Sequence, residues 1–159
     1  MKRLYHCSVS GESCAEFDRT CDDKGATIAS VISTNSFIFG GYTSTSWRTG
    51  AGGLAAYVVS PGAFVFSLTN PDGAEPTKYV VEDPTKAAVF HSKRDGVYGP
   101  FFGSPGGWGL TCRFGDGFES YAEFPDNYDT TGRGDATFTG SRIFTLDKME
   151  VWSVLLAKD

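Results

Sequence analysis

The two histidines, His6 and His91, are the chain's only imidazole bases. A hydrolase needs a nucleophile, a base and an orienting group that converge on one site. His6 lies close to the N-terminus, and His91 ends an apolar run, which is typical of a residue at the edge of a core. The sequence also lacks a Gly-x-Ser-x-Gly elbow, a P-loop and a His-Glu-x-x-His pattern. We therefore predict no catalytic residues and no turnover.

Four cysteines could carry redox or metal chemistry. Cys14 and Cys21 are seven residues apart on an expected helix, about 10 Å along its axis, which is too far for a disulfide. The spacing of Cys7, Cys14 and Cys21 contains none of the close pairs that structural zinc sites use. We expect buried thiols that act as small apolar side chains.

A peroxide-reactive thiol needs exposure and a lowered pKa. Cys14 falls in the first turn of the expected helix, where the dipole favours a thiolate, but the apolar stripe of that helix turns its side chain toward the core. Asp22 and Asp23 raise the pKa of the neighbouring Cys21 thiol, and Cys112 lies within a strand. The sequence predicts that no cysteine reacts quickly with peroxide.

Three aspartates, Asp126, Asp129 and Asp135, fall in a polar loop at 125–135. Their spacing matches no EF-hand pattern, and a calcium ion needs six or more oxygen ligands. We expect a solvated acidic loop, with no metal and no other cofactor. The loop also contains Arg133-Gly134-Asp135, the tripeptide that integrins recognise, but nothing in the sequence indicates secretion.

Glu150 is the carboxylate best placed for recognition. Strand alternation puts Glu150, Trp152 and Val154 on one face of the expected last strand. The other face carries Met149, Val151 and Leu155. A carboxylate on a partly apolar face is either paired with Arg or Lys or has a perturbed pKa, and we favour the ion pair.

Trp47, Arg48 and Trp108 are further candidates for binding a partner. Tryptophan and arginine are enriched at interface hot spots, and both tryptophans lie near glycine-rich segments. Core packing is an equal alternative for Trp47, because it ends a strand.

Length and charge limit the function classes. The 159 residues suit one domain, and a formal charge of −5 with a pI near 5.0 disfavours nucleic acid and anionic membranes. No stretch approaches the roughly 20 apolar residues of a membrane span, so we expect no direct membrane insertion. Because no apolar segment follows Met1–His6, we expect a cytoplasmic protein or a domain of a longer one.

Local patterns predict one helix followed by many strands. Ser13 and Glu16 form a capping box, and a helix is expected over residues 13–23 with Gly25 as its left-handed cap. Strands are expected at 27–33, 37–43, 54–59, 63–68, 79–81, 87–91, 110–114, 120–124, 137–138, 144–146 and 150–155. No regular element is expected from 95 to 109.

These short strands predict a mainly β fold, a two-sheet antiparallel β-sandwich flanked by short helices. The Gly40-Gly41 pair inside an aromatic strand predicts a bulge or the close approach of another backbone. The expected core contains Phe17, Ile28, Val31, Phe39, Tyr42, Val58, Phe64, Phe66, Val89 and Trp152.

With these elements placed, residues 1–159 resemble a single TLDc domain, the domain of the oxidation-resistance proteins. The segments that carry the resemblance are the helix and its exit at 17–27, Ile38–Ser44 with Trp47, Ala63–Leu68 with Asn70, Tyr98–Phe101 with Gly103, and Glu150–Trp152. The chain departs from the family pattern after Phe101, where Phe102–Trp108 replaces a glycine-rich run ending in His-Asp.

The resemblance implies a non-catalytic intracellular interaction domain. It implies a role in protection against oxidative stress, and the subunits of the vacuolar-type proton ATPase as the protein partner. The alternative is a lectin-like, calcium-dependent sandwich that binds its ligand with the loops around Trp108 and Asp126–Asp135. A third reading, peroxide scavenging by thiols, follows only from the association with oxidative stress.

Overall fold

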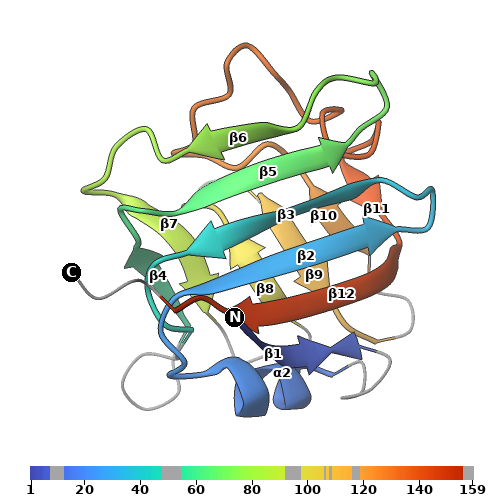
Figure 1. The fold of residues 1–159 in the computed structure, drawn as a ribbon. Coiled ribbons are helices and arrows are strands. Elements are labelled where there is room, and N and C mark those ends of the chain that lie inside the picture. The colour runs from blue at the N-terminus through green and yellow to red at the C-terminus, as the bar shows by residue number, and fades with distance from the viewer. Residues whose placement is uncertain are drawn as a thin grey trace.

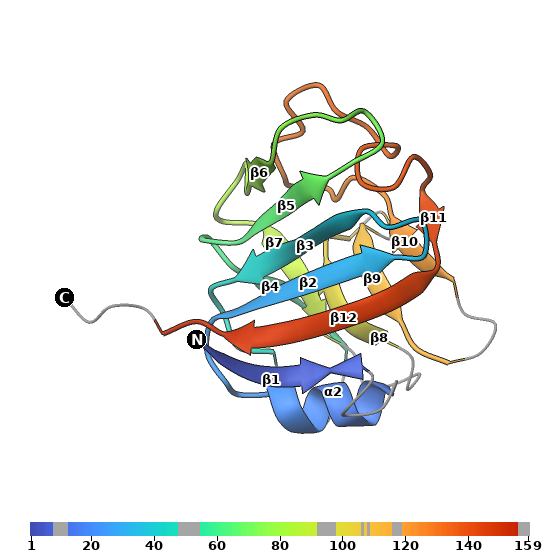
Figure 2. The same cartoon turned by 45° about the vertical axis from the view of Figure 1, so that its right-hand side comes forward.

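The computed structural model describes residues 1–7, 13–47, 55–91, 98–105, 107, 109–115 and 119–155. Its strands form two antiparallel sheets stacked face to face (Figure 1), and a view turned by 45° shows the same two layers (Figure 2). The strands are β1 (Lys2–His6), β2 (Thr27–Ser33), β3 (Ile38–Thr43), β4 (Ala56–Val59), β5 (Phe64–Thr69), β6 (Thr77–Val80), β7 (Ala87–His91), β8 (Tyr98–Phe102), β9 (Leu110–Arg113), β10 (Ser120–Ala122), β11 (Ile143–Phe144) and β12 (Leu146–Ser153).

The two layers are here called the front sheet, of order β1-β12-β2-β3-β5-β6, and the back sheet, of order β11-β10-β9-β8-β7-β4. Their inner faces interdigitate through aromatic rings. Phe39 of β3 meets Phe144 of β11 at a ring-centroid distance of 5.1 Å, and Trp47 meets Phe102 of β8 at 5.6 Å. The predicted two-sheet antiparallel sandwich is confirmed.

The described helix, α2 (Cys14–Cys21), closes one end of the sandwich beside β1 and β8 (Figure 1). The Ser13 hydroxyl accepts a hydrogen bond from the Glu16 N–H at 3.1 Å, which confirms the predicted cap. The helix ends two residues earlier than predicted, because Asp22 is extended and caps it; Gly25 has the expected positive φ but lies beyond the end. Within the described residues, no helix has the length and apolarity that a bilayer crossing requires.

The strand predictions hold best where pairing is local. The hairpin of β2 and β3 forms around the turn at 34–36, as predicted. Two strands were not predicted: β1, which pairs with the distant β12, and β8, whose Gly-Pro step hides the strand pattern. The strand expected at 137–138 is wrong, because these residues form a turn.

The Gly40-Gly41 pair fits two close approaches: one by a backbone, as the sequence predicted, and one by a side chain, which it did not predict. A Cβ on Gly41 would lie 2.6 Å from the Phe102 ring of the back sheet. A Cβ on Gly40 would overlap the Ala29 carbonyl oxygen of β2 and meet the Phe66 ring at 2.8 Å. Only hydrogen fits at either position, so the two glycines allow the sheets and strands to approach this closely.

The predicted core is right in part. Phe17, Val31, Phe39 and Val89 are buried between the layers, and Val58 packs against them half-buried. Four predicted core residues instead lie on the outer face of the front sheet, as does the buried Phe66. The four are Ile28, Tyr42, Phe64 and Trp152. Alternation is the reason: in β2, Thr27, Ala29, Val31 and Ser33 are buried while the intervening residues are half-buried.

Candidate functional site

Glu150 lies on the outer face of the front sheet among three donors. Its carboxylate accepts a hydrogen bond from Trp152 Nε1 at 2.9 Å and lies 3.3 Å from His6 Nε2 and 3.5 Å from Arg3 Nη1. The preference for an ion pair is thus confirmed. We call these four residues the Glu150 cluster.

The register of the sheet builds this cluster. Pairing of β1 with β12 sets His6 opposite Glu150 and Arg3 opposite Trp152. Glu150 and Trp152 are two residues apart and therefore share a face, whereas Met149 and Val151 are fully buried on the other side. Sequence reasoning missed Arg3 and His6, since β1 was not recognised as a strand; the cluster of basic residues at 2–6 was the available signal.

The cluster lies at one end of an apolar row that crosses the front sheet. Successive cross-strand pairs join Arg3 of β1 to Val80 of β6. We call this row the outer belt, and it consists of Arg3, Trp152, Ile28, Tyr42, Phe64 and Val80. The four central residues are half-buried and Val80 is 46% exposed. No described segment crosses this face (Figure 1, Figure 2).

Ring contacts bind the belt together. Tyr42 and Phe64 stack with centroids 5.0 Å apart. The Lys78 ammonium lies 4.8 Å from the Phe64 centroid, and the Arg3 guanidinium lies 5.9 Å from that of Trp152. The belt therefore presents aromatic rings that pack on one another and are flanked by cations.

Trp47, a predicted partner-binding residue, belongs to the core. Its side chain is 2% exposed, and Nε1 donates to Thr27 Oγ1 at 2.8 Å. Its ring also contacts Phe17 and Phe102. Of the two readings of Trp47, core packing is the correct one. The other two candidates, Arg48 and Trp108, lie outside the described residues.

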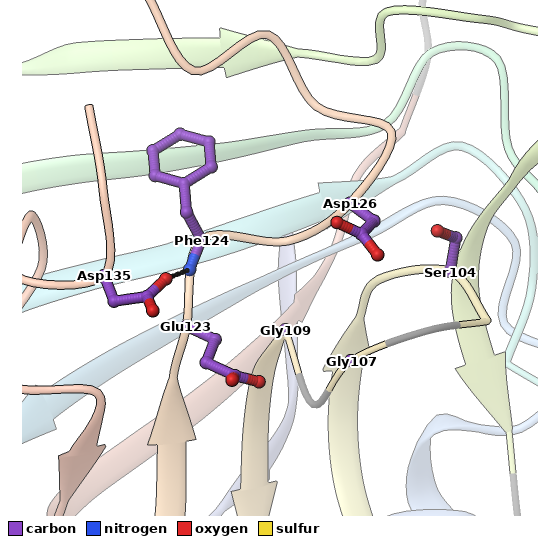
Figure 3. A pocket seen from close by; sticks show the side chains of 7 residues that line it. All are labelled: Ser104, Gly107, Gly109, Glu123, Phe124, Asp126 and Asp135. Carbon is purple, nitrogen blue, oxygen red and sulfur yellow. Dashed lines mark hydrogen bonds between the residues drawn. The ribbon is translucent and has the colours of Figure 1, made fainter. Parts of the chain in front are cut away.

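An acidic pocket of ≈ 190 Å³ lies at one end of the back sheet, where β8 ends, β9 begins and β10 ends (Figure 3). Glu123 is 3.4 Å from Arg142 Nε, and Asp135 Oδ1 accepts the Phe124 N–H at 2.9 Å. These contacts neutralise or satisfy two of its three carboxylates. The pocket is lined by Ser104, Gly107, Gly109, Glu123, Phe124, Asp126 and Asp135.

The aspartates of the loop at 125–135 do not converge. Asp126 and Asp135 line the pocket, whereas Asp129 Oδ1 accepts the Thr131 N–H within its own turn. Among the described residues, no group of three acidic, histidine or cysteine side chains is arranged to hold a metal ion. Arg133 Nη1 donates to Asp72 at 3.0 Å, so the integrin-type tripeptide is engaged in the fold.

All four cysteines are buried. Burial, followed by the charge of Asp18, raises the pKa of the Cys14 thiol to about 12. Burial also raises the pKa of Cys21 to about 12, and Asp22 adds to it as the sequence predicted. Burial has the same effect on Cys112. Three of the four thiols thus carry little thiolate at neutral pH.

Comparison with known proteins agrees with the resemblance seen in the sequence. A model of the TLDc domain family matches residues 1–155 of the 159-residue chain. No curated protein matches it. The matched range runs from β1 to β12 and contains both the Gly40-Gly41 step and the Glu150 cluster.

Proposed function

The chain belongs to the TLDc domain family, and we propose that it is a non-catalytic interaction domain that binds a protein partner in the cytoplasm. The outer face of the front sheet carries this proposal. Aromatic side chains there are half-exposed in a continuous row, and such a patch on a folded domain marks an interaction site. The Glu150 cluster adds a positioned carboxylate at its edge.

We propose subunits of the vacuolar-type proton ATPase as the partner, on the ground of the family resemblance. Protection against oxidative stress then operates through this partner. The raised pKa values of Cys14, Cys21 and Cys112 support this route, because a direct peroxide scavenger needs a thiolate. The alternative of a calcium-dependent lectin has no supporting observation among the described residues, so one function is proposed.

Affinity capture tests the proposal. The wild-type domain should recover proton-ATPase subunits, identified by mass spectrometry, from a lysate. Glu150→Lys should reduce the recovery, because Trp152, His6 and Arg3 would lose the carboxylate that holds them together at this end of the face. We expect this structural loss to outweigh the attraction that the added positive charge would have for an acidic partner. The matched control is Glu119→Lys, which makes the same charge change at an exposed site beside β10 of the back sheet.

Melting curves of both variants establish that each is folded before recovery is compared. Failure of the wild type to recover any ATPase subunit would remove this partner. If Glu150→Lys and Glu119→Lys recover the same amount of ATPase subunits, the Glu150 cluster has no role in binding them.

A further inference from the structure

The outer belt spans the whole width of the front sheet. Its register is unbroken from Trp152 through Ile28 and Tyr42 to Phe64. A neighbouring row on the same face adds Phe66, which packs over Gly40. A partner segment laid across the strands would therefore contact apolar side chains at every step.

The outer face of the front sheet carries net positive charge, whereas the whole chain is negative. Pairing places three cations on it, Arg3, Lys78 and Lys148, against one carboxylate, Glu150, whereas the chain carries a formal charge of −5. Glu150 is already engaged by the donors of its cluster. The exposed Asp147 lies at the register shift of β12, outside the ladder pairs. The face is thus locally basic on an acidic protein.

This local charge discriminates between occupants. A second copy of the chain would bring the same three cations against them, which costs energy. A long polyanion, such as nucleic acid or an anionic membrane surface, would meet the repulsive field of the whole acidic domain. A short acidic segment experiences mainly the nearby cations, because salt screens more distant charges.

We propose that the outer face of the front sheet binds an acidic protein segment with interspersed apolar side chains. Apolar side chains of the segment pack on Tyr42 and Phe64, and its carboxylates reach Lys78 and Lys148. Within the described residues, neither lysine forms an ion pair. The Lys78 ammonium contacts the Phe64 ring, and this contact leaves its charge without a carboxylate partner. The inference rests on the proposed function, since it specifies the chemistry of the partner.

Three synthetic peptides test the proposal on the full chain. They share the same leucine and phenylalanine positions and carry glutamate, glutamine or lysine between them. Fluorescence anisotropy should show the glutamate peptide binding at least about tenfold more tightly than the lysine peptide. The double variant Lys78→Glu/Lys148→Glu should reverse this preference.

The matched control is Lys24→Glu/Lys86→Glu, which makes the same charge change outside the front sheet. It should keep the preference for glutamate. Absence of binding by all three peptides, an unchanged preference in Lys78→Glu/Lys148→Glu, or an equal effect of the control would overturn the proposal. Self-association of the wild type through this face, seen by analytical ultracentrifugation and lost in Lys78→Glu/Lys148→Glu, would also overturn it.

The two proposals fail separately. If the domain captures ATPase subunits but shows no selectivity among the peptides, only the proposal of an acidic segment is wrong. If the domain selects the glutamate peptide but captures no ATPase subunit, the docking surface stands and only the named partner is wrong.

Discussion

The inner and outer faces of the front sheet do not divide apolar and polar side chains in the usual way. The inner face buries hydroxyl-bearing residues, Thr27, Ser33, Thr43 and Ser67, beside its apolar core. The outer face, in contrast, carries Ile28, Tyr42, Phe64, Phe66 and Trp152. An antiparallel sheet with one solvated face normally alternates apolar-in and polar-out. The apolar outer face is therefore a feature that folding alone does not require.

This mixed distribution has a physical basis in how each face accommodates its polar groups and its rings. Inside, three of the four hydroxyls find partners: Trp47 Nε1 donates to Thr27 Oγ1, Thr43 and Ser60 are hydrogen-bonded at 3.1 Å, and Ser33 Oγ donates to Asn35. The fourth, Ser67 Oγ, is buried with no hydrogen-bond partner among the described residues. Outside, the rings shield one another by stacking, and lysine and arginine cover their faces. Side-chain type alone thus does not reveal which face is buried.

Removing one aromatic ring from each face gives the largest contrast in stability. Phe39→Ala, inside and 0% exposed, should lower the free energy of unfolding by about 3–5 kcal/mol. Phe64→Ala, outside, should cost only about 1 kcal/mol, because its ring is half-buried. Urea unfolding measures both. Equal losses would mean that the outer face contributes to folding as much as the core does.

The buried cysteines of the interior should also react slowly. A thiol reagent added to the folded protein at neutral pH should modify Cys14, Cys21 and Cys112 far more slowly than a free thiol. Their pKa values are raised from an ordinary 9.0 to about 12, so their contribution to stability is complete below pH 9 and is lost as the pH rises toward 12.

The rate of modification of each cysteine is measured from neutral pH upward, with urea-unfolded protein as the control. One cysteine that reacts faster than a free thiol would contradict the assignment of the interior as inert and revive direct peroxide scavenging.

A smaller effect is expected where the inner face meets the back sheet. Gly41→Ala should cost about 1–3 kcal/mol, because the new methyl group would crowd the Phe102 ring. Gly134→Ala is the matched control, since a Cβ there meets nothing within 4 Å. Thermal unfolding of the two variants checks the difference. Comparable melting temperatures would show that the two sheets can move apart at no cost.

Calcium should have the smallest effect of all. Two of the three carboxylates of the acidic pocket are satisfied, Glu123 by Arg142 and Asp135 by a backbone N–H, and the neighbouring Asp129 bonds within its own turn. Melting curves with calcium and with chelator should therefore coincide. A rise of several degrees with the ion would indicate binding to the folded state and move the recognition site from the outer face to the loops.

The features that the sequence predicted correctly depend on residues that are close together along the chain. The helix cap at Ser13, the hairpin around residues 34–36 and the face shared by Glu150 and Trp152 all follow from spacings of a few residues. Strand parity, had it been applied to residues 27–33, would have separated Ile28 from Val31. Choosing core residues by size overrode that parity, since Ile28 and Val31 cannot both point inward from one regular strand.

Long-range pairing explains the remaining differences. Arg3 and His6 reach Glu150 only because β1 pairs with β12 from the other end of the chain. Trp47 is buried because Thr27 and Phe102, from two different sheets, converge on it. Neither arrangement leaves a local pattern in the sequence. The acidic pocket likewise joins Ser104, Gly107 and Gly109 to residues 123–135.

The position of β12 between β1 and β2 has a consequence for the order of folding. Until residues 146–153 have left the ribosome, β1 has no partner and β2 has one unpaired edge. Such long sequence separations slow folding, and an unpaired edge exposes the nascent chain to misassociation. The Glu150 cluster forms at the same step, because its residues come from β1 and β12. The surface proposed to bind a partner is thus completed only when the last strand closes the sheet.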